Sequence, residues 1–155
     1  METEAIDAKD RRILRELQAD ARLSVTELAS RVHLSATATA ARVRRLTEEG
    51  FILGHHARLD PSRLGRGLIV FVEVKLERTT EDVFTAFGEA AKSNDDIMEC
   101  HMVAGGFDYL LKARVADMAA YRLFLAKALG ELPGIRETHT YAVTEEIKNT
   151  SSIPV

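Results

Sequence analysis

The sequence predicts an α+β protein with two domains, a helical one followed by one that mixes strands and helices. Before residue 60, apolar residues recur three or four positions apart, whereas from Leu68 onward several stretches alternate with a period of two. Between these regions, Asp60–Gly67 contains one proline and two glycines, which are typical of a turn-rich hinge. We therefore expect domains at 1–59 and 68–148, a hinge at 60–67 and a C-terminal tail at 149–155.

The first domain is expected to contain three short helices. Asp7 begins the first. Ser24 begins the second and forms a capping box with Glu27, and Ser35 begins the third. Gly50 ends the third helix. Two short strands at 51–54 and 55–59 would then form a small hairpin, so the predicted arrangement is a winged helix-turn-helix.

The second domain reads in the order β-α-β-β-α-β, which predicts a ferredoxin-like sandwich with helices on one face of the sheet. Some strands carry apolar residues on both faces, since Ile69 and Phe71 alternate with Val70 and Val72. A sheet with a partly apolar second face usually has a partner, so we expect two copies to pack sheet against sheet as a two-fold dimer. The expected strands are 68–77, 97–103, 108–115 and 135–147, and the expected helices start at Thr79 and Asp117.

Charge is distributed unevenly along the chain. Residues 1–66 contain twelve Lys and Arg and ten Asp and Glu, a net charge of +2, whereas residues 67–155 contain nine and fourteen, a net charge of -5. Such a modest positive charge indicates weak nucleic-acid binding by one copy and tighter binding by several. No apolar run approaches the roughly 20 residues that span a membrane, and the acidic N-terminus does not resemble a signal peptide. A single cysteine, Cys100, fits the reducing cytoplasm.

The third helix combines small residues at its start with three arginines and no acid from Ser35 to Leu46. A narrow N-terminal end can enter the major groove of double-stranded DNA, and arginines can reach phosphates or guanine edges. The alternative is an ordinary solvated helix face. The residues expected to face inward are Ala36, Thr39, Ala40, Val43 and Leu46. The predicted DNA-contacting residues are Ser35, Thr37, Ala38 and Ala41 against bases, Arg42 and Arg45 against guanine or phosphate, and Arg44 against phosphate.

Gly105, Gly106 and Asp108 lie in a predicted turn between two strands. One interpretation is a hairpin that needs glycine for a positive φ. The other is an amino-acid pocket, in which glycine N–H groups hold a carboxylate and Asp108 holds the ammonium. Adjacent strand residues such as Cys100 and His101 point to opposite faces and cannot bind one metal ion. No catalytic motif is present, so we expect that the protein is not an enzyme and that it binds neither a metal ion nor a cofactor.

Several stretches spread over almost the whole chain carry a resemblance to a known family. They are IDAKDRRILRELQADAR, LASRVHLS, RVRRLTEEGFI, ECHMVAGGFDYLLKARV, DMAAYRLFL and LPGIRETHTYAVTEEIK. In these residues the chain resembles the leucine-responsive regulator/asparagine regulator (Lrp/AsnC) family of transcription factors. The resemblance implies a DNA-binding domain, a domain that binds a small effector, commonly an amino acid, and homodimers that assemble further, often into octamers.

Two departures from the family pattern leave details open. The family often has Ser-Pro-Thr-Pro-Cys at the start of the third helix, whereas Ser35–Ala40 contains no proline, so the operator sequence cannot be transferred. The family's effector loop often reads Gly-Asp-Phe-Asp, whereas this chain keeps only the second acid, Asp108. By resemblance, Met102, Met118 and Tyr141 also match positions in or beside the effector pocket, the alternative being core packing.

The sequence therefore predicts a cytoplasmic transcriptional regulator whose oligomeric state and DNA binding respond to an amino acid. Two alternatives belong to other classes. A small-molecule sensor with a vestigial DNA-binding head would be unaffected by loss of Arg42 and Arg45. An enzyme using the second domain would turn over an amino acid, although the sequence offers no acid/base or metal constellation for it.

Overall fold

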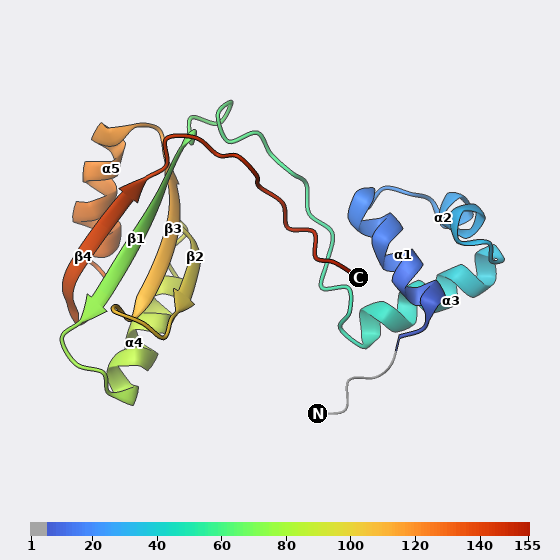
Figure 1. Cartoon of the computed structure of the whole chain (residues 1–155), viewed down its shortest axis with the longest axis horizontal. Coiled ribbons are helices and arrows are strands. Elements are labelled where there is room, and N and C mark those ends of the chain that lie inside the picture. Colours follow the sequence, from blue (N-terminus) through green and yellow to red (C-terminus); the bar gives the residue numbers. More distant parts are fainter. Residues whose placement is uncertain (1–5) are drawn as a thin grey trace. The chain divides into compact units, whose positions relative to one another are not determined.

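The computed structural model describes residues 6–155, which divide into two compact units (Figure 1). The first unit contains the chain up to Arg58 together with the C-terminal segment Asn149–Val155. The second unit contains Leu59–Lys148. The α+β fold class predicted from the sequence is confirmed.

The first unit contains α1 (Ala8–Ala19), α2 (Val25–Val32) and α3 (Ala36–Glu48). The predicted caps are present. Asp7 caps α1, Ser24 and Glu27 form the capping box of α2, and the Ser35 hydroxyl accepts from the Ala38 N–H. Between α2 and α3, His33 adopts a left-handed conformation with φ of 55°, which turns the chain sharply enough to form a helix-turn-helix.

A small hydrophobic core joins the three helices. Each helix contributes at least one buried residue, so the axial rotation of α3 depends on its contacts with both other helices. The buried members are Ile13, Leu14, Leu28, Val32 and Leu46.

The two strands predicted at 51–54 and 55–59 do not form, and residues 51–60 are irregular. Phe51 and Ile52 instead pack against the helical core, and both of their N–H groups bond to the carbonyl of Leu46 at 2.8 and 3.0 Å. Because these two apolar residues are committed to the helices, they are not free to pair across a hairpin, and Leu53 is left 94% exposed.

The C-terminal segment Asn149–Val155 packs on the first unit of the same chain. The Gln18 side-chain amide donates to the carbonyl of Ile153 at 3.0 Å and accepts from its N–H at 2.8 Å. Arg15 Nε donates to the main-chain oxygen of Val155 at 2.8 Å, and Val155 packs against the core. These contacts hold the tail against the first unit of its own chain.

The second unit is built on a four-stranded antiparallel sheet with strand order β2-β3-β1-β4. The strand order is that of the predicted ferredoxin-like sandwich. The strands are β1 (Leu68–Leu76), β2 (Ile97–Met102), β3 (Tyr109–Val115) and β4 (Ile135–Ala142).

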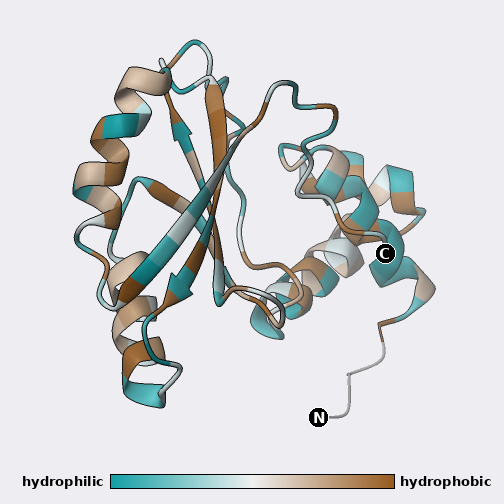
Figure 2. Ribbon diagram, turned by 60° about the vertical axis from the view of Figure 1, so that its left-hand side comes forward, coloured by the Kyte–Doolittle hydropathy of each residue, from teal (hydrophilic) through white to brown (hydrophobic). Residues whose placement is uncertain are grey.

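Helices α4 (Glu81–Lys92) and α5 (Met118–Phe124) cover one face of the sheet (Figure 1), and α5 continues as a π-helical turn, η1 (Leu125–Leu129). Hydrophobic and hydrophilic residues are interleaved along these strands and helices (Figure 2). Alternate residues of β1 and β3 therefore enter a core that is larger than that of the first unit. Its fully buried centre consists of Val70, Val72, Val74, Phe87 and Leu111.

The other face of the sheet carries no helix and has mixed chemistry. Phe71 of β1 lies between Lys112 of β3 and Tyr141 of β4. Two residues further along β1, Glu73 lies between Leu110 and His139 of the same two strands. Aromatic and apolar residues thus alternate with charged ones on this open face. This composition matches a polar interface better than an ordinary core.

Candidate DNA interface and effector hairpin

The outward face of α3 differs from the one predicted. Thr39 and Leu46 are buried as expected, but Ala36 and Ala40, which were predicted to face inward, are exposed. Ala38, Arg42 and Arg45, predicted to face outward, are partly buried. The helix is therefore rotated so that Thr37, Ala41 and Arg44, at spacings of four and three residues, are exposed together on one side.

A buried aspartate on α1 holds two of the α3 arginines on the inward side. Asp10 is 1% exposed, and its two carboxylate oxygens accept from Arg42 Nη1 at 2.8 Å and from Arg45 Nη2 at 2.6 Å. Arg42 also donates to Asp7 at 2.7 Å. Two of the three arginines predicted to contact DNA are thus bound to acids of α1.

This network perturbs its members in the expected directions. The pKa of Asp7 is lowered to about 2, mainly because the Asp10 N–H donates to its carboxylate and also because Arg42 bonds to it. Hydrogen bonds to Asp10 raise the pKa of both Arg42 and Arg45. Asp7, Arg42 and Arg45 are therefore charged at neutral pH.

Sequence reasoning missed Asp10 as a functional residue, although a signal was present. Asp10 lies on the apolar stripe of α1, because it is three or four positions from Ile6, Ile13 and Leu14. An acid on a buried stripe must find cationic partners, because an unpaired buried charge is costly. The arginines of α3 supply them.

Arg44 has a different environment from its two neighbours. It is exposed, and among residues 6–155 it forms no ion pair. It is therefore the α3 arginine whose guanidinium is available to a ligand outside the chain.

The hairpin between β2 and β3 contains Gly105 and Gly106. Neither has a positive φ, so the turn itself does not require glycine. A Cβ atom added at either position would meet no atom within 4 Å, so packing does not require it either. Within the described part of the chain, neither amide N–H has a hydrogen-bond partner. The interpretation that these glycines serve a positive φ is wrong.

Asp108 has a structural role in this hairpin. Its Oδ2 accepts from the N–H of Leu76 at 2.7 Å, and its own main chain bonds to Val74 and Val103. It thus fixes the hairpin to the end of β1. One carboxylate oxygen is committed to the fold, and the other accepts no hydrogen bond from residues 6–155.

The six predicted effector residues do not come together within one chain. Met102, which is 59% exposed, adjoins the hairpin with Gly105, Gly106 and Asp108. Met118 follows the far end of β3, and Tyr141 pairs with Phe71 midway along the β1–β3 ladder. Since β3 rises about 3.3 Å per residue, roughly 20 Å separates its two ends. A pocket that used Met118 together with the hairpin would need more than one chain.

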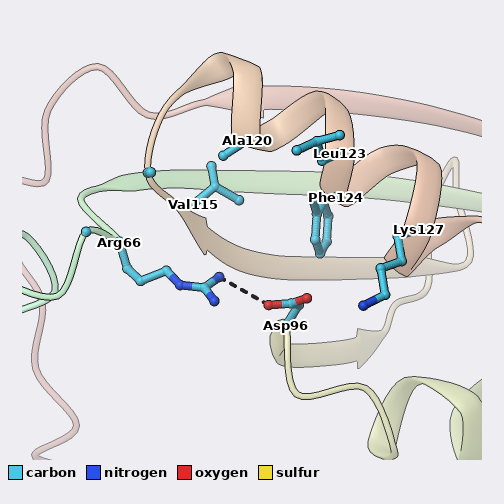
Figure 3. Close-up of a pocket in the computed structure, with 9 residues that line it drawn as sticks. Arg66, Asp96, Val115, Ala120, Leu123, Phe124 and Lys127 are labelled. Atoms are coloured by element: carbon cyan, nitrogen blue, oxygen red, sulfur yellow. Dashed lines mark hydrogen bonds and ion pairs between the residues drawn. The ribbon is translucent and has the colours of Figure 1, made fainter.

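A separate cavity of about 250 Å³ lies at the hinge end of the second unit (Figure 3). Arg66 and Lys127 approach Asp96 from opposite sides, below the apolar side chains of Val115 and Phe124 in this view. Arg66 Nη1 donates to Asp96 at 3.1 Å and to the carbonyl of Arg114 at 3.2 Å. None of the predicted effector residues lines this cavity, and its polar groups largely satisfy each other.

Other chemistry is limited within the described range. No group of His, Cys, Asp and Glu among residues 6–155 could hold a metal ion. Burial raises the pKa of the Cys100 thiol, which makes it a poor nucleophile at neutral pH. None of the helices of this range is both long enough and apolar enough to span a membrane.

Comparison with known families matches both units. Residues 6–52 match a winged helix-turn-helix DNA-binding model, and residues 69–153 match the Lrp/AsnC ligand-binding domain. A helix-turn-helix joined to a ligand-binding sandwich defines the class of transcriptional regulators that couple DNA binding to a small molecule. The chain belongs to the Lrp/AsnC family of this class.

Individual relatives agree with this assignment. The leucine-responsive regulatory proteins of Escherichia coli strain K12 and Klebsiella pneumoniae are each 49% identical over 150 residues, covering 97% of this chain and 92% of theirs. A Neisseria meningitidis transcriptional regulator solved in complex with L-Met matches with a TM-score of 0.90 and 31% identity, covering 97% of each chain. An AsnC family regulator from Agrobacterium tumefaciens matches with a TM-score of 0.92 and 33% identity, covering 96% of this chain and 97% of the other. These relatives are regulators rather than enzymes.

Proposed function

We propose that the chain regulates transcription in the cytoplasm by binding double-stranded DNA through α3, in response to an amino acid held at the β2–β3 hairpin. The observation that carries the effector part is the pair Gly105 and Gly106, which the chain itself does not need as glycines. Because glycine has no side chain, a molecule outside the chain can approach the main chain closely at these two positions.

The DNA interface that we propose is the exposed side of α3 and its N-terminus. Ser35, Thr37, Ala38 and Ala41 are small enough for a helix end to enter the major groove. Arg44 lies further along and is exposed for a phosphate contact. The predicted direct contacts of Arg42 and Arg45 are not favoured, because both guanidiniums are bound to acids.

The effector site that we propose uses the free N–H groups of Gly105 and Gly106 for the ligand's carboxylate. The uncommitted oxygen of Asp108 faces the ammonium, and Met102 offers an apolar contact. Met118 and Tyr141 would complete the pocket from a second chain. The leucine-responsive relatives and the L-Met complex make L-leucine and L-methionine the first ligands to test.

The assembly that we propose is a homodimer through the open sheet face, assembling further to an octamer. Support comes from Phe71, Leu110 and Tyr141, which place apolar surface among charged residues on that face. It also comes from the separation of the two groups of effector residues in one chain. An amino acid that binds between dimers would stabilise one assembly over another and change the spacing of the α3 helices.

Footprinting of DNA from upstream of the protein's own gene, with and without L-leucine and L-methionine, tests this proposal. We expect a protected region whose extent or affinity changes when one of these amino acids is added. A protein that is folded, by its circular dichroism, and yet protects no region would contradict the DNA part. Protection that no amino acid alters would contradict the effector part alone.

A further inference from the structure

Asp7, Asp10, Arg42 and Arg45 form a network of four side chains, which Glu49 joins through Arg45 at 3.7 Å. Asp10 accepts from Arg42 and Arg45, Asp7 accepts from Arg42, and Asp7 and Asp10 also bond to each other's main-chain N–H groups as a capping box. The formal charges of the four side chains cancel. The network therefore contributes little net positive charge to the DNA-facing side.

Because Asp10 is buried, neither of its two arginine partners is free to leave it. A guanidinium that left for a phosphate would leave the carboxylate, 1% exposed, with one partner fewer in a poorly solvated site. Arg44 has no such commitment, because it is exposed and forms no ion pair with any other residue in 6–155. Moving to a DNA phosphate is therefore costly for Arg42 and Arg45 but not for Arg44.

The same network sets the rotation of α3. It holds Arg42 and Arg45 toward α1, while Leu46 and Thr39 are buried against the core. These inward contacts leave Thr37, Ala41 and Arg44 on the exposed side.

We propose that Asp10 is a positioning residue for DNA binding, which holds Arg42 and Arg45 as spacers between α1 and α3 so that Arg44 is the α3 arginine that neutralises a phosphate. This inference rests on the proposed DNA binding by α3. It assigns different roles to three arginines that the sequence presents as one cationic face.

The test measures how many phosphates the protein neutralises, from the salt dependence of binding to a mixed-sequence DNA duplex, which requires no known operator. The slope of log K against log salt changes by about 0.9 for each phosphate that the protein no longer neutralises. We expect Arg44→Gln to make the slope shallower by about 0.9 for each copy that touches the duplex. Arg42→Gln and Arg45→Gln remove the same charge from the same helix and serve as matched controls, with little expected change in slope.

A second variant, Asp10→Asn, probes the positioning role itself. It keeps the size of the side chain but removes the charge that holds the two arginines, which are then free to reach phosphates. We expect non-specific binding of the folded variant to show a steeper salt slope than wild type, together with a smaller preference for footprinted DNA over the mixed-sequence duplex. A merely structural role would weaken both kinds of binding without steepening the slope.

The outcomes separate this inference from the proposed function. Wild-type protein that shows no salt-dependent binding to any duplex would overturn DNA binding as a whole. Salt-dependent binding in which Arg42→Gln or Arg45→Gln lowers the slope as much as Arg44→Gln would overturn the positioning role alone. If Asp10→Asn fails to fold, as judged by circular dichroism, the comparison of the three Arg→Gln variants still tests the positioning role.

Discussion

The two candidate sites of the molecule differ in how far one chain completes them. On α3, the side chains are fixed from within, since Asp10 binds two of the three arginines and leaves the third exposed. In the β2–β3 hairpin, Gly105 and Gly106 have open space and free N–H groups, whereas Met118 lies beyond the far end of β3 and Tyr141 lies midway along the sheet. In our proposal, the DNA-binding site is organised before it binds, whereas the effector site is completed only by a ligand and further copies of the chain.

The difference shows where each site is vulnerable. A preorganised site fails when its internal supports are removed, even if no contacting residue is changed. An incomplete site fails when its space is filled, even if the isolated chain is unaffected. Single substitutions and a change of pH can test this contrast, from the largest expected effect to the smallest.

Filling the hairpin should have the largest effect on ligand binding. Gly106→Val adds a side chain where no atom lies within 4 Å, so the free protein should melt as wild type does. The stabilisation by an amino acid, about 2.7 kcal/mol at a hundred times its Kd, should disappear. Thermal-shift measurements with L-leucine and L-methionine check this, and Gly88→Val, on helix α4, is the matched control with equally open space. An unchanged ligand shift in Gly106→Val would rule out the hairpin as the site.

Asp108 should separate a structural role from a ligand role. Asp108→Ala removes the acceptor of the partly buried Leu76 N–H, which should cost about 1–3 kcal/mol of stability. Asp108→Asn keeps an acceptor oxygen and loses only the charge, so it should remain nearly as stable as wild type but bind the amino acid weakly. Chemical denaturation and ligand titration of both variants test this. Full ligand affinity in Asp108→Asn would show that this carboxylate does not hold the ammonium.

Thr39 offers a gain in stability on the inward face of α3. Its side chain is fully buried, and its Oγ1 is the single buried side-chain polar atom without a partner in residues 6–155. Thr39→Val keeps the β-branched shape and removes the unpaired hydroxyl, which should stabilise the first unit by about 1 kcal/mol. Thermal unfolding of wild type and of Thr39→Val would measure this gain in stability. A loss of stability would mean that the hydroxyl has a partner, such as an ordered water.

Acid should weaken the network that positions α3. The pKa of Asp7 is about 2 in the folded protein, below its ordinary value, so its contribution to stability is complete above about pH 4 and is lost as the pH falls towards 2. Asp7→Asn should therefore be less stable than wild type at neutral pH, with the two proteins converging near pH 2. Asp20→Asn, at the other end of α1, controls for loss of one negative charge. A constant difference between Asp7→Asn and wild type over this range would contradict the assigned cause.

Much of the fold could be predicted because it follows from local patterns. The caps at Ser24 and Ser35 and the change of period at Leu68 placed the starts of α2, α3 and β1 correctly, whereas the last strand, expected to reach residue 147, ends at Ala142. The predicted strands at 51–59 failed because Phe51 and Ile52 have the composition of a strand, while their packing partners belong to the helices. Periodicity cannot distinguish these cases.

The sites were harder to predict, since their geometry depends on residues far apart in sequence. The face of α3 was set by Asp10, more than thirty residues away, so the arginines alone suggested a single cationic surface. The glycines of the hairpin were recognised, but only the backbone angles and the empty space around them decided against the structural explanation.

If the effector site is complete only in the assembled protein, as we propose, its affinity for the amino acid must depend on the oligomeric state. The most direct test measures amino-acid affinity over a dilution series of the protein, with the oligomeric state at each concentration followed by sedimentation. We predict that affinity falls as the assembly dissociates, and that the ligand in turn favours assembly. Equal affinity in the monomer and in the assembled protein would contradict it.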